Sequence, residues 1–385
     1  MPPDVAIPLH RVDFDASDRS ALAAALDSGL LTGDGGFNRS LAALACEALG
    51  CAAAFPVPSG THALELLFRA LPLDPGGEVI LPSFTFVSAA NAILMAGGTP
   101  VFADVEPATL NLDPDSAAAR VTDRTRAIIT GHYAGVAAGL ERLESLTQAH
   151  GLALLEDAAH ALGGRYADRP LGTWGRAAAF SFHGTKNIVA GEGGMLVTRD
   201  GPLADRAEII REKGTDRRRF LRGDVDKYTW QAVGSSYLMS DLLAALVASQ
   251  WRRLDAIRAA RHQRWERYME AFAPLERQGC LTLPVVPTVC QPAFHIFYLR
   301  VEGVATRQRL QAGLRARGIE ASPHFAPLHL SPYARARWHL GPGSLPVTEQ
   351  AAESLLRLPL YPTLTTAEQD AVITEVRSFF GLGAL

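Results

Sequence analysis

Short apolar runs alternate with segments of helical periodicity from about residue 60 to residue 198. This alternation predicts a mostly parallel β-sheet covered by helices, because parallel strands need crossover connections that are usually helical. The expected strands are EVILP at 78–82, TPVFADV at 99–105, RAIITGH at 126–132, LALLED at 152–157, AAAFSF at 177–182 and GGMLVT at 193–198. Ligands of such sheets bind beyond the carboxyl ends of the strands, so His132, Asp157 and Ser181 should lie on one rim.

The pattern changes in the last third of the chain. A long helical segment begins near Ser240, a suitable N-terminal cap, and after Pro284 the isolated strand HIFYLRVE is followed by amphipathic stretches. These stretches predict helices near 305–317, 348–357 and 366–380. We therefore predict an α/β protein with a large domain over residues 1–245. Residues 246–385 would form the connecting long helix and a smaller C-terminal α/β domain.

The composition narrows the class of protein. Of 385 residues, 48% are hydrophobic and 20% are charged, which is typical of a globular chain with a packed core. The net charge of −3 comes without a long basic run, so we expect no nucleic-acid partner. No apolar run reaches the roughly 18 residues of a membrane span, the first residues do not resemble a signal peptide, and the four cysteines lack metal-binding or disulfide spacing. We expect a cytoplasmic protein without a membrane partner or a bound metal.

The segment AFSFHGTKNIVAGEGGML contains Lys186, one of only three lysines among 37 lysine and arginine residues. A lysine amine, with an ordinary pKa of about 10.4, becomes a nucleophile when burial or a nearby cation lowers that pKa. The apolar run before Lys186 would supply burial, and the glycines after it would allow close backbone approach. The alternative is a surface lysine in a loop, which is disfavoured in a chain that otherwise uses arginine on its surface.

Two other segments carry candidate chemistry. Glu156 and Asp157 follow a buried strand, and strand alternation lets only one of them enter a given pocket. Without other evidence, Asp157 would be interpreted as the N-terminal cap of a helix.

In VPSGTHALELL, Ser59, Gly60 and Thr61 open a helix, where free N–H groups bind phosphate, although a plain capped helix is the alternative. Pyridoxal phosphate requires an anion anchor, a carboxylate for its pyridinium nitrogen and a Schiff-base amine, and these segments together supply all three.

Many segments match one enzyme family. They are GDGGF at 33–37, PSFTFVSAANA at 82–92, GHYAGVA at 131–137, EDAAH at 156–160, FSFHGTKN at 180–187, GEGG at 191–194, IIREKGT at 209–215, VDKYTW at 225–230, GSSYLMSDL at 234–242 and RLPLYP at 357–362. On these segments the chain resembles the DegT-type sugar-nucleotide aminotransferases, which are fold type I pyridoxal phosphate enzymes. Within that family it is most similar to the dTDP-4-keto-6-deoxy-D-glucose 4-aminotransferases. The resemblance implies a homodimer whose active site is shared between the subunits.

The resemblance also assigns residues to the cofactor, pyridoxal 5'-phosphate. Lys186 would form the Schiff base and move protons, and Asp157 would pair with the pyridinium nitrogen. His160 stands where many relatives have glutamine near the phenolic oxygen, and there a histidine adds a pH-sensitive donor. Phe86 would stack on the ring unless it is an ordinary core phenylalanine. The other implied cofactor contacts are Ser59, Gly60, Thr61 and Ser181 around the phosphate and Ser236, in GSSYL, from across the dimer; the implied substrate contacts are His132, Tyr133, His183 and Arg219.

The implied reaction transfers the amino group of L-glutamate to C4 of a dTDP-linked 4-keto-6-deoxy-D-glucose. The products would be dTDP-4-amino-4,6-dideoxy-D-galactose and 2-oxoglutarate (EC 2.6.1.59), in deoxyaminosugar biosynthesis. A 4-keto pentose or 3-keto hexose nucleotide would require only modest changes of pocket shape. The cluster Arg217–Arg219 is either a solvated loop or an anion-binding loop for the diphosphate.

Other classes of protein fit less well. A non-catalytic sugar-nucleotide-binding relative would have no need of Lys186, Asp157 and the phosphate loop together. A Ser/His/Asp hydrolase lacks its GxSxG turn here, and a dinucleotide-dependent enzyme lacks its GxGxxG spacing.

Overall fold

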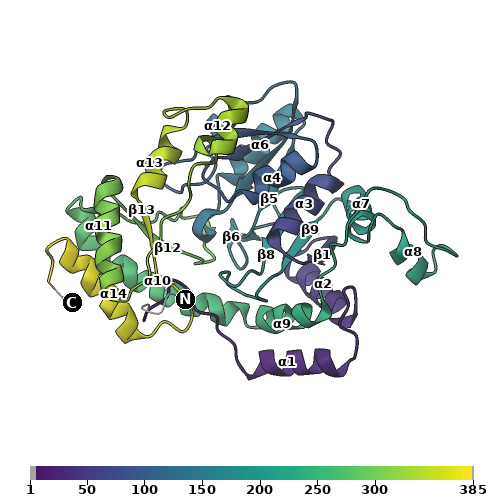
Figure 1. Cartoon of the computed structure of the whole chain (residues 1–385), viewed down its shortest axis with the longest axis horizontal. Coiled ribbons are helices and arrows are strands. Elements are labelled where there is room, and N and C mark those ends of the chain that lie inside the picture. Colours follow the sequence, from purple (N-terminus) through teal and green to yellow (C-terminus); the bar gives the residue numbers. More distant parts are fainter. Residues whose placement is uncertain (1–5, 384–385) are drawn as a thin grey trace.

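The computed structural model describes residues 6–383 of the chain (Figure 1). Its largest sheet has seven strands in the order β1-β9-β8-β5-β4-β2-β3. They are β1 Ala53–Val57, β2 Glu78–Pro82, β3 Thr99–Ala103, β4 Thr125–Gly131, β5 Ala153–Asp157, β8 Ala177–Ser181 and β9 Gly194–Thr198. Every neighbouring pair from β8 to β3 is parallel, which confirms the predicted mostly parallel sheet.

All six predicted strands are present, and the sheet has one further strand, β1, at its edge. The proline in β1 is tolerated there because an edge strand leaves some N–H groups unpaired. β9 runs antiparallel to both β1 and β8. The direction reverses because residues 182–193 join β8 to β9 without a crossover helix. Lys186 lies in this connection.

Helices cover both faces of the large sheet, so its strands are nearly continuous apolar runs. One face carries α3 (Gly60–Ala70), α4 (Ser88–Met95) and α7 (Gly201–Arg211); the other carries α2 (Gly36–Leu49), α5 (Pro114–Ala118), α6 (Leu140–His150) and α9 (Asp241–Arg252). Strand alternation divides the side chains between these faces: Leu155 packs on the α3 side and Leu154 on the α6 side. The next two residues of β5, Glu156 and Asp157, follow the same division.

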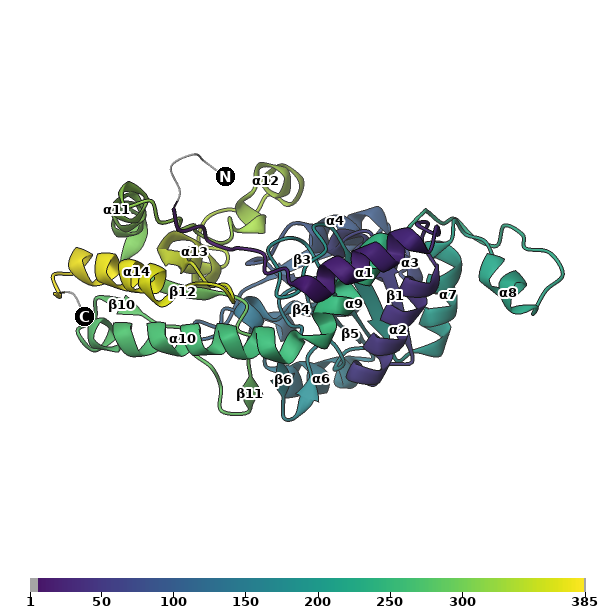
Figure 2. The same ribbon diagram turned by 90° about the horizontal axis from the view of Figure 1, so that it is seen from below.

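The long helical segment after Ser240 is two helices. Ser240 caps α9 by accepting the N–H of Leu242, as predicted, but α9 ends at Arg252. α10 (Leu254–Arg277) then runs from the large sheet to a second, three-stranded sheet (Figure 2). This antiparallel sheet has the order β10 (Leu281–Thr282), β12 (Phe297–Val301) and β13 (Leu355–Leu358).

Helices α11 (Gly303–Ala316), α13 (Pro346–Ser354) and α14 (Thr366–Phe379) lie around the second sheet. The prediction of a helix at 348–357 is wrong at its C-terminal end, because residues 355–358 form β13. Leu355 and Leu356 are fully buried in different clusters, so this apolar run is a strand covered on both faces. Ile7 pairs with Ile319 beside this sheet. The domain boundary between residues 245 and 246 stays a prediction.

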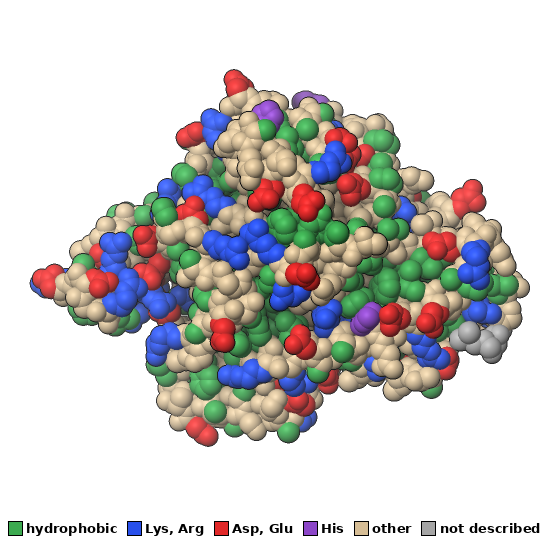
Figure 3. All heavy atoms as spheres, turned by 180° about the vertical axis from the view of Figure 1, so that it is seen from behind, with side chains coloured by type: hydrophobic (Ala, Val, Ile, Leu, Met, Phe, Trp, Pro, Cys, Tyr) green, Lys and Arg blue, Asp and Glu red, His purple; other side chains and the backbone are tan. Residues whose placement is uncertain are grey.

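An arm projects from the large sheet between α7 and α9 (Figures 1 and 2). It carries α8 (Arg217–Arg222), and charged side chains crowd its surface (Figure 3). Arg217 forms an ion pair with Glu212, and Arg218 with Asp34, so these two arginines of the basic cluster are already paired.

The remaining elements are α1 (Ala16–Asp27), α12 (Pro332–Trp338), the 3-10 turns Tyr133–Gly135 and Leu328–Leu330, and a third sheet of β6 (Arg165–Tyr166), β7 (Arg169–Pro170) and β11 (Cys290–Gln291). Among the described helices none has both the length and the apolar character needed to cross a bilayer.

Candidate active site

Lys186 lies in the connection between β8 and β9, where its backbone N–H bonds to the carbonyl of His183 in a tight turn. Burial lowers the pKa of the Lys186 amine from 10.5 to about 8, Asp157 opposes this shift and Arg357 adds to it. Within residues 6–383 the Nζ atom makes no hydrogen bond and no ion pair. At pH 7 about one-tenth of such an amine is unprotonated, which fits the activated lysine predicted from the sequence.

Asp157 and Glu156 point to opposite sides of β5, as strand alternation predicts. Glu156 is fully buried and accepts the N–H groups of Gly172 at 2.8 Å and Gly175 at 2.7 Å. Asp157 opens into a cavity beside Lys186, and its Oδ1 accepts the N–H of Ala159 at 3.1 Å. No helix follows at residues 158–163, so the reading of Asp157 as a helix cap is wrong.

Burial raises the pKa of Asp157, because a carboxylate loses hydration there. In the described part of the chain Asp157 has no ion-pair partner. A buried carboxylate is stable as an anion only when a cation or several donors accompany it. Among the described residues Asp157 therefore lacks a cationic partner, and the protonated ring nitrogen of a ligand would supply one.

The start of α3 forms a cradle for an anion. Ser59 caps the helix by accepting the N–H of His62, which leaves the N–H groups of Gly60 and Thr61 without partners among residues 6–383. A Cβ atom at Gly60 would lie 2.8 Å from Cβ of Ser181, so glycine lets the helix start approach the end of β8. The Ser181 hydroxyl stands beside these free N–H groups, which together suit a phosphate.

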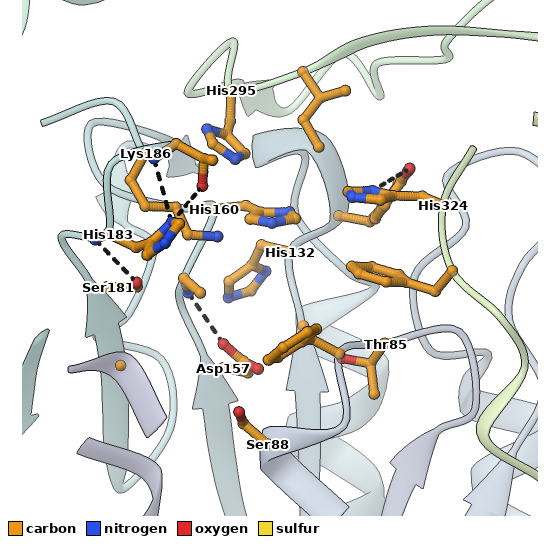
Figure 4. Close-up of a pocket in the computed structure, with 18 of the residues that line it drawn as sticks. Thr85, Ser88, His132, Asp157, His160, Ser181, His183, Lys186, His295 and His324 are labelled. Carbon is orange, nitrogen blue, oxygen red and sulfur yellow. Dashed lines mark hydrogen bonds between the residues drawn. The ribbon is translucent and has the colours of Figure 1, made fainter. Parts of the chain in front are cut away.

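These groups line one cavity of about 370 Å³ (Figure 4). The predicted residues Ser59, Gly60, Thr61, Phe86, His132, Tyr133, Asp157, His160, Ser181, His183 and Lys186 all lie on it. The expectation that the polar strand ends converge on one rim is therefore confirmed. Phe86 is 58% exposed, so the alternative of an ordinary core phenylalanine is wrong.

Histidines from three parts of the chain meet in this cavity (Figure 4). The His160 ring lies 4.3 Å from the His295 ring and is stacked parallel to His324 at 6.4 Å. Burial, with Lys186 as the next cause, lowers the pKa of His160 well below its usual value. His160 therefore stays neutral near neutral pH, and the expected pH-sensitive hydrogen bond is not supported.

His132 and Tyr133 have partners inside the protein. His132 Nε2 lies 2.9 Å from Oε2 of Glu156, and its Nδ1 accepts the N–H of Ala138 at 3.4 Å. With both ring nitrogens engaged, His132 borders the cavity without a free donor. The Tyr133 hydroxyl lies 3.2 Å from Nδ1 of His324. The assignment of both residues to a sugar stays a prediction.

His183 is exposed at the edge of the cavity, with Nδ1 3.0 Å from the Thr185 hydroxyl. Ser236 and Arg219 lie outside this cavity of their own chain. Both are exposed, Ser236 at the base of the arm, where it pairs with Glu212, and Arg219 on α8. Their roles, which were expected across a dimer, also stay predictions.

The site also contains polar residues that were not predicted, among them His10, His295, His324 and Arg357. They come from segments far from the glycine-rich and strand-end motifs. A signal existed for one of them, since Arg357 opens RLPLYP, which matched the family without an assigned role.

Comparison with known proteins assigns the chain to a family. The model of the DegT/DnrJ/EryC1/StrS aminotransferase family matches residues 12–377. The chain belongs to this family. TlmJ of Streptoalloteichus hindustanus is 32% identical over 98% of both chains, with a TM-score of 0.88. DesV of S. venezuelae is 32% identical over 97% of this chain and 98% of its own, with a TM-score of 0.89. Spr1654 of Streptococcus pneumoniae, in its PMP form, is 25% identical over 97% of both chains, with a TM-score of 0.89.

The protein is thus a sugar aminotransferase of the DegT family and depends on pyridoxal 5'-phosphate. The residues present fit that cofactor. The free N–H groups at the start of α3 suit its phosphate, the unpaired carboxylate of Asp157 suits its ring nitrogen, and the unpartnered amine of Lys186 suits its aldehyde.

Proposed function

We propose that the protein transfers the amino group of L-glutamate to C4 of dTDP-4-keto-6-deoxy-D-glucose. The products are dTDP-4-amino-4,6-dideoxy-D-galactose and 2-oxoglutarate, for deoxyaminosugar biosynthesis in the cytoplasm. The observation that carries amino transfer is the single cavity shared by the Lys186 amine, the Asp157 carboxylate and the start of α3. The choice of sugar rests on the resemblance of the sequence motifs.

When bound, the cofactor withdraws electrons from the substrate carbon that carries the amino group. Asp157 holds a proton on the ring nitrogen, because its buried carboxylate is stabilised by that positive charge. Lys186 would remove the proton from the substrate carbon and deliver it to the cofactor carbon on the other side of the transferred nitrogen. With a pKa of about 8 its amine can both accept and release a proton near neutral pH.

The remaining cavity wall suits a sugar. Tyr133 and His324 present polar atoms among the apolar rings of Phe84 and Phe325. Burial, with Arg357 as the next cause, lowers the pKa of His324 to about 2, so this imidazole stays neutral. A neutral imidazole can donate to or accept from a hydroxyl or a keto oxygen.

We further propose a homodimer in which the arm of each chain completes the partner's site. Ser236 and Arg219 lie on this arm, outside the cavity of their own chain. Trp230 and Val233 on the same arm are 74% and 70% exposed, and large exposed apolar side chains that gather on a projecting segment favour contact with another protein surface.

A panel of keto sugars tests the substrate. Holoenzyme with L-glutamate is incubated with dTDP-linked 4-keto-6-deoxyglucose, a 4-keto pentose and a 3-keto hexose, and the amino sugars are identified by mass spectrometry and NMR. We expect the 4-amino-4,6-dideoxygalactose product. Preferential amination of another member would replace the sugar, and absence of amino sugar from every member would reject the substrate class.

A further inference from the structure

The two arginines that line the cavity differ in how closely the protein itself binds them. The cationic side chains are Lys186, Arg261 and Arg357, and the carboxylates are Asp157 and Glu192. Glu192 is mostly exposed at the outer edge of the cavity. A guanidinium stays charged in proteins, so each arginine on this wall needs acceptors from the protein or from a ligand.

Arg261 has two close acceptors within the protein, although its Nη1 makes no hydrogen bond among residues 6–383. Its Nε donates to the Phe294 carbonyl at 2.9 Å and its Nη2 to the His295 carbonyl at 2.6 Å. The side chain is almost completely buried, and these bonds hold the backbone that carries His295. Arg261 is therefore a structural part of the wall.

Arg357 is differently placed. Its Nε and Nη2 reach the carbonyls of Ser322 and Pro323 only at 3.3 Å, and within residues 6–383 its Nη1 has no acceptor and no carboxylate lies within ion-pair distance. Burial lowers the pKa of this guanidinium, while Tyr133 and Glu320 oppose the shift without forming an ion pair or a hydrogen bond with it. An incoming anion would find at least one free donor here.

The position of Arg357 indicates which anion. Arg357 lines the same cavity as Lys186, His160 and His324, and its charge contributes to lowering the pKa of all three. In an amino acid the α-carboxylate is bonded to the very carbon that carries the amino group. The diphosphate of a nucleotide sugar is separated from C4 by the sugar ring and the glycosidic bond, so its site lies farther out.

We infer that Arg357 binds the α-carboxylate of the amino donor and selects an α-amino acid for the first half of the reaction. This inference rests on the proposed donor, L-glutamate. A guanidinium and a carboxylate match in shape and charge, and such pairs are among the stronger hydrogen bonds in proteins.

The test measures the two half-reactions separately in holoenzyme by cofactor absorbance. L-glutamate converts the aldehyde form to the amine form, and dTDP-4-keto-6-deoxy-D-glucose reverses the change. In Arg357→Gln we expect the half-saturating concentration of L-glutamate to rise on the order of 10- to 100-fold, with that of the keto sugar unchanged. Arg300→Gln is the matched control, because Arg300 lies on the neighbouring strand β12 and does not line the cavity.

A second substrate isolates the contact. The α-amide of L-glutamate lacks the carboxylate charge, so wild-type enzyme should lose much of its affinity on this change and Arg357→Gln should lose little. Cofactor content and melting temperature report folding, and Arg357→Met, which also removes the charge, replaces the glutamine variant if that variant does not fold.

Three results would overturn the inference. The first is an equal loss of affinity for the α-amide, relative to L-glutamate, in the wild type and in the variant. The second is a weakened keto-sugar half-reaction with normal glutamate binding, which would assign Arg357 to the diphosphate. The third is a wild-type holoenzyme whose cofactor absorbance changes with no amino acid, which would reject both the proposed donor and the inference. Failure of the keto sugar alone leaves the glutamate half-reaction measurable, so the two failures are distinguishable.

Discussion

The cavity has two sides of different origin. The rim is formed by the ends of β5 and β8 and the turn that carries Lys186, and the wall is formed by His295, His324 and Arg357 around the second sheet. The rim holds groups that any amino acid or sugar would need for proton movement and cofactor binding. We propose that the groups of the wall contact the substrate and not the cofactor. On this proposal, different parts of the chain determine the type of reaction and the choice of substrate.

The largest effect is expected at the rim, from Lys186→Ala. If this amine moves the proton, as we propose, amino transfer should fall by on the order of 10³-fold or more, for every sugar and amino donor alike. Amino sugar formed per minute and the absorbance of the bound cofactor measure this loss. Lys213→Ala is the control, since Lys213 is exposed on the arm. Turnover of the alanine variant near the wild-type rate would refute the assignment of Lys186.

The next effect comes from Asp157→Asn, which keeps the shape and removes the charge. We expect both half-reactions to slow on the order of 10²- to 10³-fold, because the ring nitrogen then loses its anionic partner. Single-turnover absorbance measurements with glutamate and with keto sugar check this. Asp205→Asn, exposed on α7, should be neutral. A loss confined to one half-reaction would show that Asp157 acts on a substrate and would break the distinction between rim and wall.

A smaller and selective effect is expected at the wall, from His324→Ala. Loss of one hydrogen bond to the sugar costs about 1 kcal/mol, which raises the KM for the keto sugar roughly five- to tenfold. The half-saturating concentration of L-glutamate should change less. Steady-state kinetics with each substrate varied in turn provide the measurement, and equal changes in both constants would place His324 with the rim.

The smallest effect concerns the pKa of Lys186 and how far the charges of Arg357, on the wall, and Asp157, on the rim, change it. In cofactor-free protein, acetylation of Lys186 by acetic anhydride should rise with pH through a midpoint of about 8, because only the unprotonated amine reacts. Arg357→Gln removes a neighbouring cation, favours the ammonium form and moves the midpoint upward; Asp157→Asn removes an anion and moves it downward.

Peptide mass spectrometry follows this labelling, with Lys213 and Lys227 as internal references. A midpoint that stays unchanged in both variants would mean that burial alone sets the pKa of Lys186, and that rim and wall are electrically independent.

The sequence predicted the rim better than the wall for a physical reason. Asp157 and Ser181 end apolar runs that alternate with helices, and parallel strands bring such ends together without knowledge of any distant contact. The wall depends on segments that fold back from the far end of the chain. His295 and His324 stand in stretches without a local motif, and their approach to His160 follows from tertiary packing alone.

The missed and corrected elements have similar causes. β1 pairs with β9 across more than a hundred residues, and its five residues show no pattern that separates a strand from a loop. The helix expected at 348–357 ends early because its leucines are buried on both faces of a strand, which helical periodicity cannot distinguish over so short a run.

The hairpin formed by β8 and β9 has a consequence for folding kinetics. Its register joins Ser181 to Gly194 across a short stretch of chain, whereas the same glycine pairs with Val57 from a distant segment. Contacts that are local in sequence form before contacts that close long loops. We expect the turn that carries Lys186 to be ordered early, as a nucleus onto which the edge strand adds later, so that the Lys186 amine is held in place before the sheet around it is complete.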